Sequence, residues 1–141
     1  MQNFDLIVIG TGSGGSVTAG KCAKAGWDVA QVDALPFGGT CALRGCDPKK
    51  VLVGAAELLD WNQRMKGNGI TSNASINWQE LMQFKRTFTE PVPAHREKGM
   101  NKVGITPIHG EASFVDEQTI EVNGEQYSAD HCNFRFLFGK I

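Results

Sequence analysis

The sequence lacks the features that would direct it to a membrane or to nucleic acid. None of its apolar runs approaches the ~20 residues that a helix needs to span a bilayer. Its 14 basic residues are offset by 15 acidic ones, so the formal net charge is only −1. That balance provides no electrostatic basis for binding nucleic acid or an anionic lipid surface. We therefore expect neither class of partner.

The N-terminus also lacks a secretory signal. It has no basic start, and its apolar stretch 6–9 runs directly into glycine without a small-residue cleavage site. This absence predicts a cytoplasmic protein. The chain has only four cysteines, and cytoplasmic proteins rarely carry a structural disulfide framework. The spacing of Cys41 and Cys46, five positions apart, therefore indicates redox or metal chemistry.

Glycine, in contrast, is abundant. It accounts for 17 of 141 residues, or about 12%, compared with an average near 7%. Much of this excess lies within the first 45 residues. The hydrophobic fraction of 41% is sufficient for a globular core, so we expect an ordered domain with an unusual density of glycine turns near its start.

The start of the chain has the pattern of one βαβ unit. The apolar run 4–9 predicts a buried strand, residues 16–24 predict a helix, and residues 27–32 predict a second strand that Asp33 closes. A strand, turn, helix and strand within about thirty residues match the size of such a unit.

The remainder predicts helices followed by a small antiparallel meander. Helices are expected over 41–66, over 78–88 with Asn77 as N-cap, and over 94–102, before a short strand at 104–108 and a meander over 114–127. Asn123-Gly124 is a typical hairpin signal within that meander. The sequence shows no internal repeat, low-complexity tract or linker.

A glycine motif, Gly10-x-Gly12-x-x-Gly15, joins the first predicted strand to the first predicted helix. In this pattern the first glycine permits a tight turn, the second lets the backbone approach a pyrophosphate, and the third allows close packing of helix and strand. Free amides at the helix start bind the phosphates. Asp33, 23 positions after Gly10, would accept hydrogen bonds from an adenosine ribose. Together these features predict a dinucleotide site, without separating FAD from NAD.

The second motif is Cys41-Ala-Leu-Arg-Gly-Cys46, at a predicted junction of loop and helix. A zinc site would need about four ligands, and the other cysteines and histidines form no second paired motif. Two buried, inert cysteines are the other alternative. We favour a redox pair and expect no metal, because helix-start amides and the charges of Lys49 and Lys50 would favour the reactive thiolate.

Taken together, the glycine motif, Asp33 and the segment Gly38-Gly-Thr-Cys-Ala-Leu-Arg-Gly-Cys-Asp-Pro-Lys-Lys50 resemble the flavin-dependent pyridine nucleotide–disulfide oxidoreductases. The resemblance covers most of residues 4–131. It implies an α/β, Rossmann-like FAD-binding domain with a parallel sheet, helices and a small antiparallel meander, incomplete at the C-terminus. It also implies FAD as cofactor, NAD(P)H as the reductant of the full-length family, whose binding site is absent from this chain, and a homodimer for the full-length family.

The resemblance further implies roles for individual residues. Cys41 matches the thiol that attacks the substrate, and Cys46 matches the thiol that exchanges electrons with the flavin. The positions that would hold FAD are Gly10, Gly12, Ser13, Gly14, Gly15, Asp33, Gly39, Thr40, Cys41, Lys49, Lys50, Gly110, Glu111 and Ala112. Electrons would pass from NAD(P)H through FAD to a Cys41–Cys46 disulfide and on to a small-molecule disulfide or a related substrate.

The chain departs from the family pattern in two places. Between the cysteines it carries Ala42-Leu43-Arg44-Gly45, and Asp47 precedes Pro48, where the common reductases differ. After His131 the family pattern stops, so we expect a partial FAD-binding domain over 1–131 with the redox-active disulfide, and a divergent tail over 132–141 from a frameshift or a truncation. The chain alone is then expected to be inactive. The alternatives are a non-catalytic remnant and a flavin-free thiol redox module.

Overall fold

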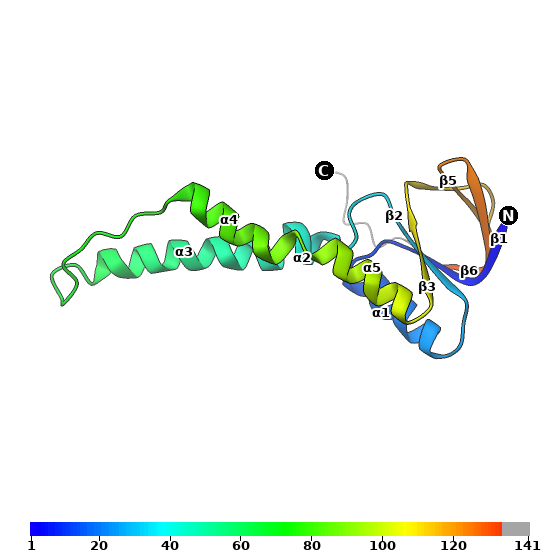
Figure 1. Ribbon diagram of the computed structural model, residues 1–141, viewed down its shortest axis with the longest axis horizontal. Coiled ribbons are helices and arrows are strands. Elements are labelled where there is room, and N and C mark those ends of the chain that lie inside the picture. Colours follow the sequence, from blue (N-terminus) through cyan, green and yellow to red (C-terminus); the bar gives the residue numbers. More distant parts are fainter. Residues whose placement is uncertain (134–141) are drawn as a thin grey trace. The chain divides into compact units, whose positions relative to one another are not determined.

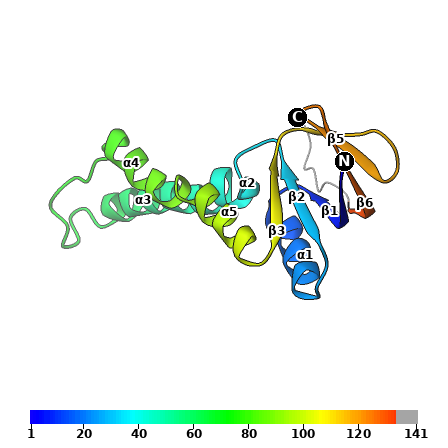
Figure 2. The same ribbon diagram turned by 45° about the vertical axis from the view of Figure 1, so that its right-hand side comes forward.

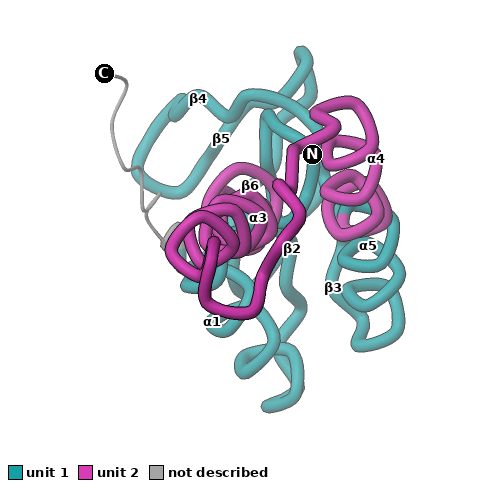
Figure 3. The backbone as a smooth tube through the Cα atoms, turned by 90° about the vertical axis from the view of Figure 1, so that its left-hand side faces the viewer, with its two compact units in different colours: residues 1–39, 93–141 teal, residues 40–92 magenta. Residues whose placement is uncertain are grey.

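The computed structural model describes residues 1–133. Residues 134–141, and with them most of the predicted divergent tail, lie outside the described part of the chain. The backbone divides into two compact units, residues 1–39 with 93–141 as unit 1 and residues 40–92 as unit 2 (Figure 3).

Unit 1 is built on a six-stranded sheet (Figure 1). Its strands are β1 (Gln2–Ile9), β2 (Val29–Asp33), β3 (Ile105–His109), β4 (Ala112–Phe114), β5 (Thr119–Val122) and β6 (Glu125–Asn133), in the order β3-β2-β1-β6-β5-β4. Strands β3, β2, β1 and β6 pair in parallel, whereas β6, β5 and β4 pair antiparallel. The predicted α/β class, with a parallel sheet and an antiparallel meander, is therefore confirmed.

The meander is not a separate sheet. Strand β6 pairs antiparallel with β5, where Ser128 faces Thr119, and in parallel with β1, where Ala129 faces Phe4. One strand therefore joins the two halves of the sheet. The sequence pattern places the meander after the helices, but it does not show that its last strand returns to the first strand of the chain.

Two apolar clusters cover the two faces of the parallel strands. Because side chains alternate along a strand, Leu6 and Val8 face one side of β1 while Ile7 faces the other. The cluster with Leu6 and Val8 also contains Ala19 of helix α1 (Ser13–Lys24) and Met100 of helix α5 (Val92–Lys102). Figure 2 shows α1 lying along the sheet. The second cluster contains side chains of β5 and β6, among them Ile120, Val122, Tyr127 and Ala129. Burial on both faces fixes the register of the strands.

The carboxyl ends of three parallel strands lie at one edge of this sheet. Ile9 of β1 is level with Val32 of β2, and Asp33 of β2 is level with His109 of β3. The glycine turn after β1, Asp33 and the residues that follow His109 therefore meet at the same edge, where open α/β sheets bind their ligands.

Unit 2 is helical. It contains α2 (Gly39–Arg44), α3 (Cys46–Arg64) and α4 (Trp78–Thr89), and α3 and α4 lie side by side (Figures 1 and 3). Asn77 caps α4, as predicted, because its side-chain oxygen accepts hydrogen bonds from the amides of Gln79 and Glu80 at 3.1 and 3.3 Å. The prediction that residues 41–66 are mainly helical is confirmed, and a break at Gly45 separates α2 from α3. Within residues 1–133, no helix combines the length and apolar character needed to cross a bilayer.

The packing of α1 on β1 predicts that a methyl group at Gly15 destabilises the protein. A Cβ there would overlap the carbonyl oxygen of Gly10, which belongs to the rigid turn. We expect Gly15→Ala to lower the free energy of unfolding by about 1–3 kcal/mol, as overpacking typically does. Denaturant unfolding of the purified chain measures this change.

Gly20 provides the matched control, because it lies in the same helix and a Cβ there would meet no atom within 4 Å. Gly20→Ala should leave the unfolding free energy unchanged or raise it by up to ~1 kcal/mol through helix propensity. Equal losses for the two variants would contradict the packing argument.

Candidate functional site

The turn between β1 and α1 uses two of its glycines for the fold itself. Gly10 has a φ of +108°, a conformation that side chains disfavour, and its amide donates to the carbonyl of Val32 at 2.6 Å. Gly15 packs against the carbonyl of Gly10, where no Cβ fits. These two positions therefore need glycine whether or not a ligand binds.

Gly12 and Gly14 have no such internal reason to be glycine. A Cβ on Gly12 would lie 4.0 Å from the Cα of Gly39, and a Cβ on Gly14 would meet nothing within 4 Å. Gly12 is the N-cap of α1, and no side chain caps the helix, so its first amides have no intrahelical acceptor. The open space lies beside these amides, as an anionic group at a helix start requires. The turn therefore fits the pyrophosphate of a dinucleotide.

Gly39 closes one side of the turn. It has a φ of +69°, and a Cβ there would overlap the Cα of Gly12 and lie 3.0 Å from the Gly12 nitrogen. At Gly39 the segment after β2 therefore touches Gly12 of the glycine turn through backbone alone. Thr40, the next predicted cofactor residue, is exposed at the start of unit 2.

Asp33 lies at the end of β2, but its carboxylate is turned toward the glycine turn. Oδ2 accepts hydrogen bonds from the amide and the hydroxyl of Thr11, at 2.8 and 2.6 Å, and Oδ1 accepts from the amide of Leu35 at 3.0 Å. Thr11 is only 1% exposed. Thr11 is not among the residues predicted from the sequence, because a threonine between two glycines does not indicate such a hydrogen bond.

The predicted FAD-binding segment Gly110 to Ala112 begins beside Asp33. The amide of Gly110 donates to the carbonyl of Asp33 at 3.0 Å. Gly110 has a φ of +151°, and a Cβ there would overlap Val122. Just before it, the ring of His109 stacks on Phe37 with a centroid distance of 4.1 Å, and its Nε2 lies 3.1 Å from Oε1 of Glu97. The structure thus brings segments around residues 12, 33 and 110 to one edge of the sheet.

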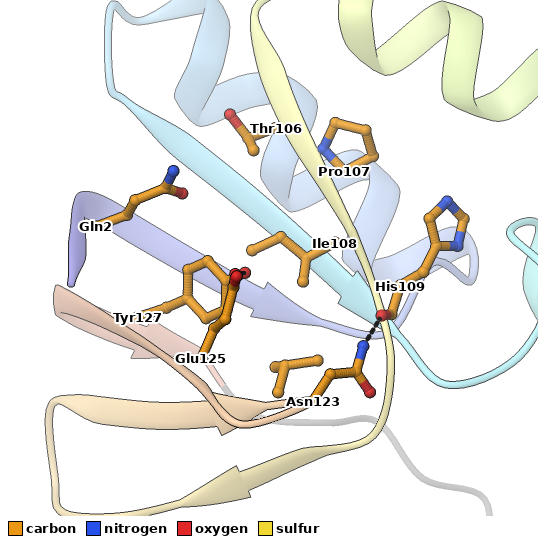
Figure 4. A pocket seen from close by; sticks show the side chains of 9 residues that line it. Gln2, Thr106, Pro107, Ile108, His109, Asn123, Glu125 and Tyr127 are labelled. Atoms are coloured by element: carbon orange, nitrogen blue, oxygen red, sulfur yellow. Dashed lines mark hydrogen bonds between the residues drawn. The ribbon is translucent and has the colours of Figure 1, made fainter.

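A cavity of about 400 Å³ lies between β3 and the meander (Figure 4). Its wall contains Tyr127, whose hydroxyl donates to Glu125 at 2.6 Å, and this bond raises the pKa of Tyr127. Asn123 closes one end by donating to the carbonyl of His109 at 2.8 Å (Figure 4). None of the predicted cofactor residues lines this cavity.

The predicted redox pair lies in unit 2, around the break in the helix. Cys41 belongs to α2, and Cys46 is the first residue of α3. A Cβ on Gly45 would lie 3.0 Å from the carbonyl oxygen of Thr40 and 3.4 Å from the Cα of Cys41. Because Gly45 has no side chain, its backbone can lie this close to Thr40 and Cys41, and the two exposed, free thiols share a hydrogen bond.

The charges of this pair differ from the expectation. The side-chain hydrogen bond with Cys46 raises the pKa of Cys41 above that of an ordinary thiol. Desolvation and electrostatic repulsion from Cys46 and Asp47 add to the increase, while a backbone hydrogen bond from Cys46 partly opposes it. The expected activation of a thiolate by helix amides and lysines is therefore not found at Cys41 in the dithiol. Lys49 and Lys50 are exposed on the first turns of α3. Within the described residues, no three His, Cys, Asp or Glu side chains are placed to hold a metal ion.

Comparison with known proteins identifies relatives along nearly the whole chain. The family described as pyridine nucleotide-disulphide oxidoreductase matches residues 4–132. Glutathione reductase of Schizosaccharomyces pombe is 35% identical over 123 residues, which cover 85% of this chain and 26% of that protein. Dihydrolipoyl dehydrogenase of Mycoplasma genitalium is 28% identical over 132 residues, which cover 92% and 29%. The chain thus spans less than a third of the length of these curated relatives.

A solved structure shows the same fold. It is the Cu(II) complex of the HOCl-induced flavoprotein disulfide reductase RclA from Escherichia coli, with a TM-score of 0.77 and 23% sequence identity. The match covers 94% of this chain and 28% of that chain.

The raised pKa of Cys41 predicts how its alkylation depends on pH. The thiolate is the reacting form, so the rate with iodoacetamide should reach half its maximum at a higher pH than for an ordinary cysteine. Replacing the partner, Cys46→Ala, removes the hydrogen bond and should move this midpoint to lower pH. Mass-spectrometric rates at Cys41 in a Cys22→Ala background measure both midpoints. A midpoint that stays or rises without Cys46 would contradict the assignment.

Proposed function

This chain belongs to the pyridine nucleotide-disulphide oxidoreductase family, and from that premise we propose that it carries the flavin site and the redox-active dithiol of a disulfide reductase. In this proposal, electrons from NAD(P)H pass through FAD to the Cys41–Cys46 disulfide and on to a small-molecule disulfide. The observation that carries the proposal is the open glycine turn, where Gly12 and Gly14 leave space that the fold does not need.

The residues of unit 1 suit the nucleotide part of FAD. The amides at the start of α1, including those of Ser13 and Gly14, would bind the pyrophosphate. The backbone of Gly110 to Ala112, which follows His109 at the same sheet edge and whose first amide donates to the carbonyl of Asp33, would meet the adenine. The chemistry supplied by FAD when bound is hydride acceptance and transfer of electron pairs.

The residues of unit 2 suit thiol–disulfide exchange. The Cys41 thiolate would attack one sulfur of the substrate disulfide, forming a mixed disulfide and releasing the other sulfur as a thiolate. The Cys46 thiolate would then attack Cys41, which forms the intramolecular disulfide and releases the second half of the substrate as a thiolate. Two protons go to the two released thiolates, and the two electrons that reduce the substrate come from the dithiol. Gly39, Thr40, Lys49 and Lys50 are proposed to lie along the flavin, as the family resemblance implies.

The relatives named glutathione reductase and dihydrolipoyl dehydrogenase support a small-molecule disulfide as substrate class. A second glycine fingerprint does not occur in these 141 residues. We therefore propose that turnover with NAD(P)H requires protein residues outside this sequence, and that the full-length enzyme works as a homodimer. A steady-state assay of the chain alone should show no NAD(P)H oxidation.

A flavin-free thiol redox module is the second candidate. The observation in its favour is that the dithiol forms entirely within unit 2, from residues 41–46. This candidate needs a reversible disulfide but no nucleotide, so flavin binding separates it from the first.

Flavin binding should depend on the space at Gly12. A methyl group there meets the protein only at 4.0 Å, so Gly12→Ala should change the unfolding free energy by no more than ~0.5 kcal/mol. The same methyl group would occupy the space proposed for the pyrophosphate, so we expect at least a tenfold rise in the dissociation constant for FAD. Quenching of flavin fluorescence measures this constant, with Gly20→Ala as control. Wild-type protein that binds no FAD, or a Gly12→Ala variant with unchanged affinity, would reject the flavin site.

The dithiol should oxidise reversibly. Titration in a glutathione redox buffer is expected to protect Cys41 and Cys46 together from alkylation and to remove two hydrogen atoms from the chain. Cys46→Ser should abolish this protection, whereas Cys22→Ser, a change within α1, should preserve it. Failure of the two thiols to protect each other would exclude both candidate functions.

A further inference from the structure

We propose that Asp33 is a positioning residue, which locks the glycine turn through Thr11 instead of gripping the adenosine ribose. This inference rests on the proposed dinucleotide site and concerns how that site chooses its ligand. Four residues form the lock, which we call the turn clasp: Thr11, Gln31, Asp33 and Gly38.

Most of the hydrogen-bond acceptor positions of Asp33 are already used within the protein. A carboxylate offers about four lone-pair positions on its two oxygens, and three of them are used inside the protein. Oδ2 accepts from the Thr11 amide at 2.8 Å and from the Thr11 hydroxyl at 2.6 Å, while Oδ1 accepts from Leu35 at 3.0 Å. Gripping both ribose hydroxyls would require breaking one of these charge-assisted bonds, which are the strong class of hydrogen bond.

The hydroxyl of Thr11 is also occupied, both as a donor and as an acceptor. Oγ1 donates to Asp33 and accepts from the amide of Gly38 at 3.1 Å. The side chain is 1% exposed, so water cannot readily replace either bond. Thr11 therefore ties the turn both to the end of β2 and to the segment that follows it, next to the contact of Gly39 with Gly12.

Gln31 adds a second tie from the same strand. It lies two residues before Asp33, so both side chains stand on the same face of β2. It is fully buried, and its Nε2 donates to the carbonyl of Gly10 at 2.8 Å. Alternate residues of β2 thus hold the consecutive turn residues Gly10 and Thr11. Its Oε1 has no partner among the described residues, a cost that an apolar side chain would avoid.

The clasp has a consequence for binding. It orders the turn before a ligand arrives, which reduces the entropy lost on binding. It also leaves at most one acceptor position on Asp33 for a ribose hydroxyl. The adenosine end of the site should therefore discriminate weakly between a ribose and a sugar that lacks its hydroxyls.

The binding test uses ADP and 2′,3′-dideoxy-ADP as probes on the full chain, with dissociation constants from calorimetry. The wild-type protein should bind the two probes with affinities that differ by less than tenfold. Thr11→Val and Asp33→Asn should each raise the dissociation constants of the two probes. Within each variant, the factor should be the same for ADP and for 2′,3′-dideoxy-ADP. A preference of tenfold or more for ADP, lost in Asp33→Asn, would overturn the proposal by showing that Asp33 grips the ribose.

A second measurement needs no ligand. Hydrogen exchange of the bonded turn amides of Gly10 and Ser16 should be at least fivefold faster in Thr11→Val and nearly unchanged in Thr11→Ser, which keeps the hydroxyl. Thr18→Val is the matched control, because its hydroxyl bonds only to Gly14 within α1. Adding Asp33→Asn to Thr11→Val should accelerate exchange by less than the product of the two single effects. The clasp would be overturned if the double variant accelerated exchange by the product of the two single effects. It would also be overturned if Thr18→Val accelerated exchange as much as Thr11→Val.

The two tests separate the two proposals. If neither ADP nor FAD binds the wild-type chain but the exchange rates are coupled as expected, the proposed flavin function fails and the clasp remains as a device that holds the turn. If the probes bind but the exchange effects multiply, the flavin site stands and the clasp fails.

Discussion

The close packing of backbone on backbone around the glycine turn is the constraint on which unit 1 depends. Gly15 lies against the carbonyl of Gly10, and Gly39 lies against Gly12. These contacts leave no room for side chains, so they bring the start of α1 to the edge where β1, β2 and β3 end. The amides of the first helical turn then face open space beside Gly12 and Gly14. This packing leaves a helix start without a side-chain cap, the kind of position that suits an anionic ligand.

The same principle operates on a smaller scale at the two cysteines. Gly45 approaches the backbone of Thr40 and Cys41, and this approach ends one helix and begins the next. Across this break, two thiols that are five positions apart share a hydrogen bond. The same hydrogen bond raises the pKa of Cys41 and so favours its protonated form.

A polar side chain at the end of a strand can form hydrogen bonds within the protein or with a ligand. The bonds that it forms within the protein show how much hydrogen-bonding capacity remains for a ligand. Asp33 occupies the place where a ribose-binding acid is expected, but most of its acceptor capacity is used by Thr11 and Leu35. Gln31 shows the same tendency, since a polar residue within the buried strand β2 bonds to the turn. The polar side chains of β2 therefore form hydrogen bonds with the backbone of the turn.

The sequence alone determined the parts that depend on local chemistry: the apolar strand, the glycines of the turn, the capping of α4 by Asn77, and the α/β class with its meander. Only the tertiary structure decided the features that depend on distant neighbours. These are the return of β6 to β1, the helix break at Gly45 and the bond between Asp33 and Thr11. The physical reason is that periodicity and glycine content report the conformation of a segment, whereas the partner of a strand or a carboxylate is set by which groups the fold brings within reach.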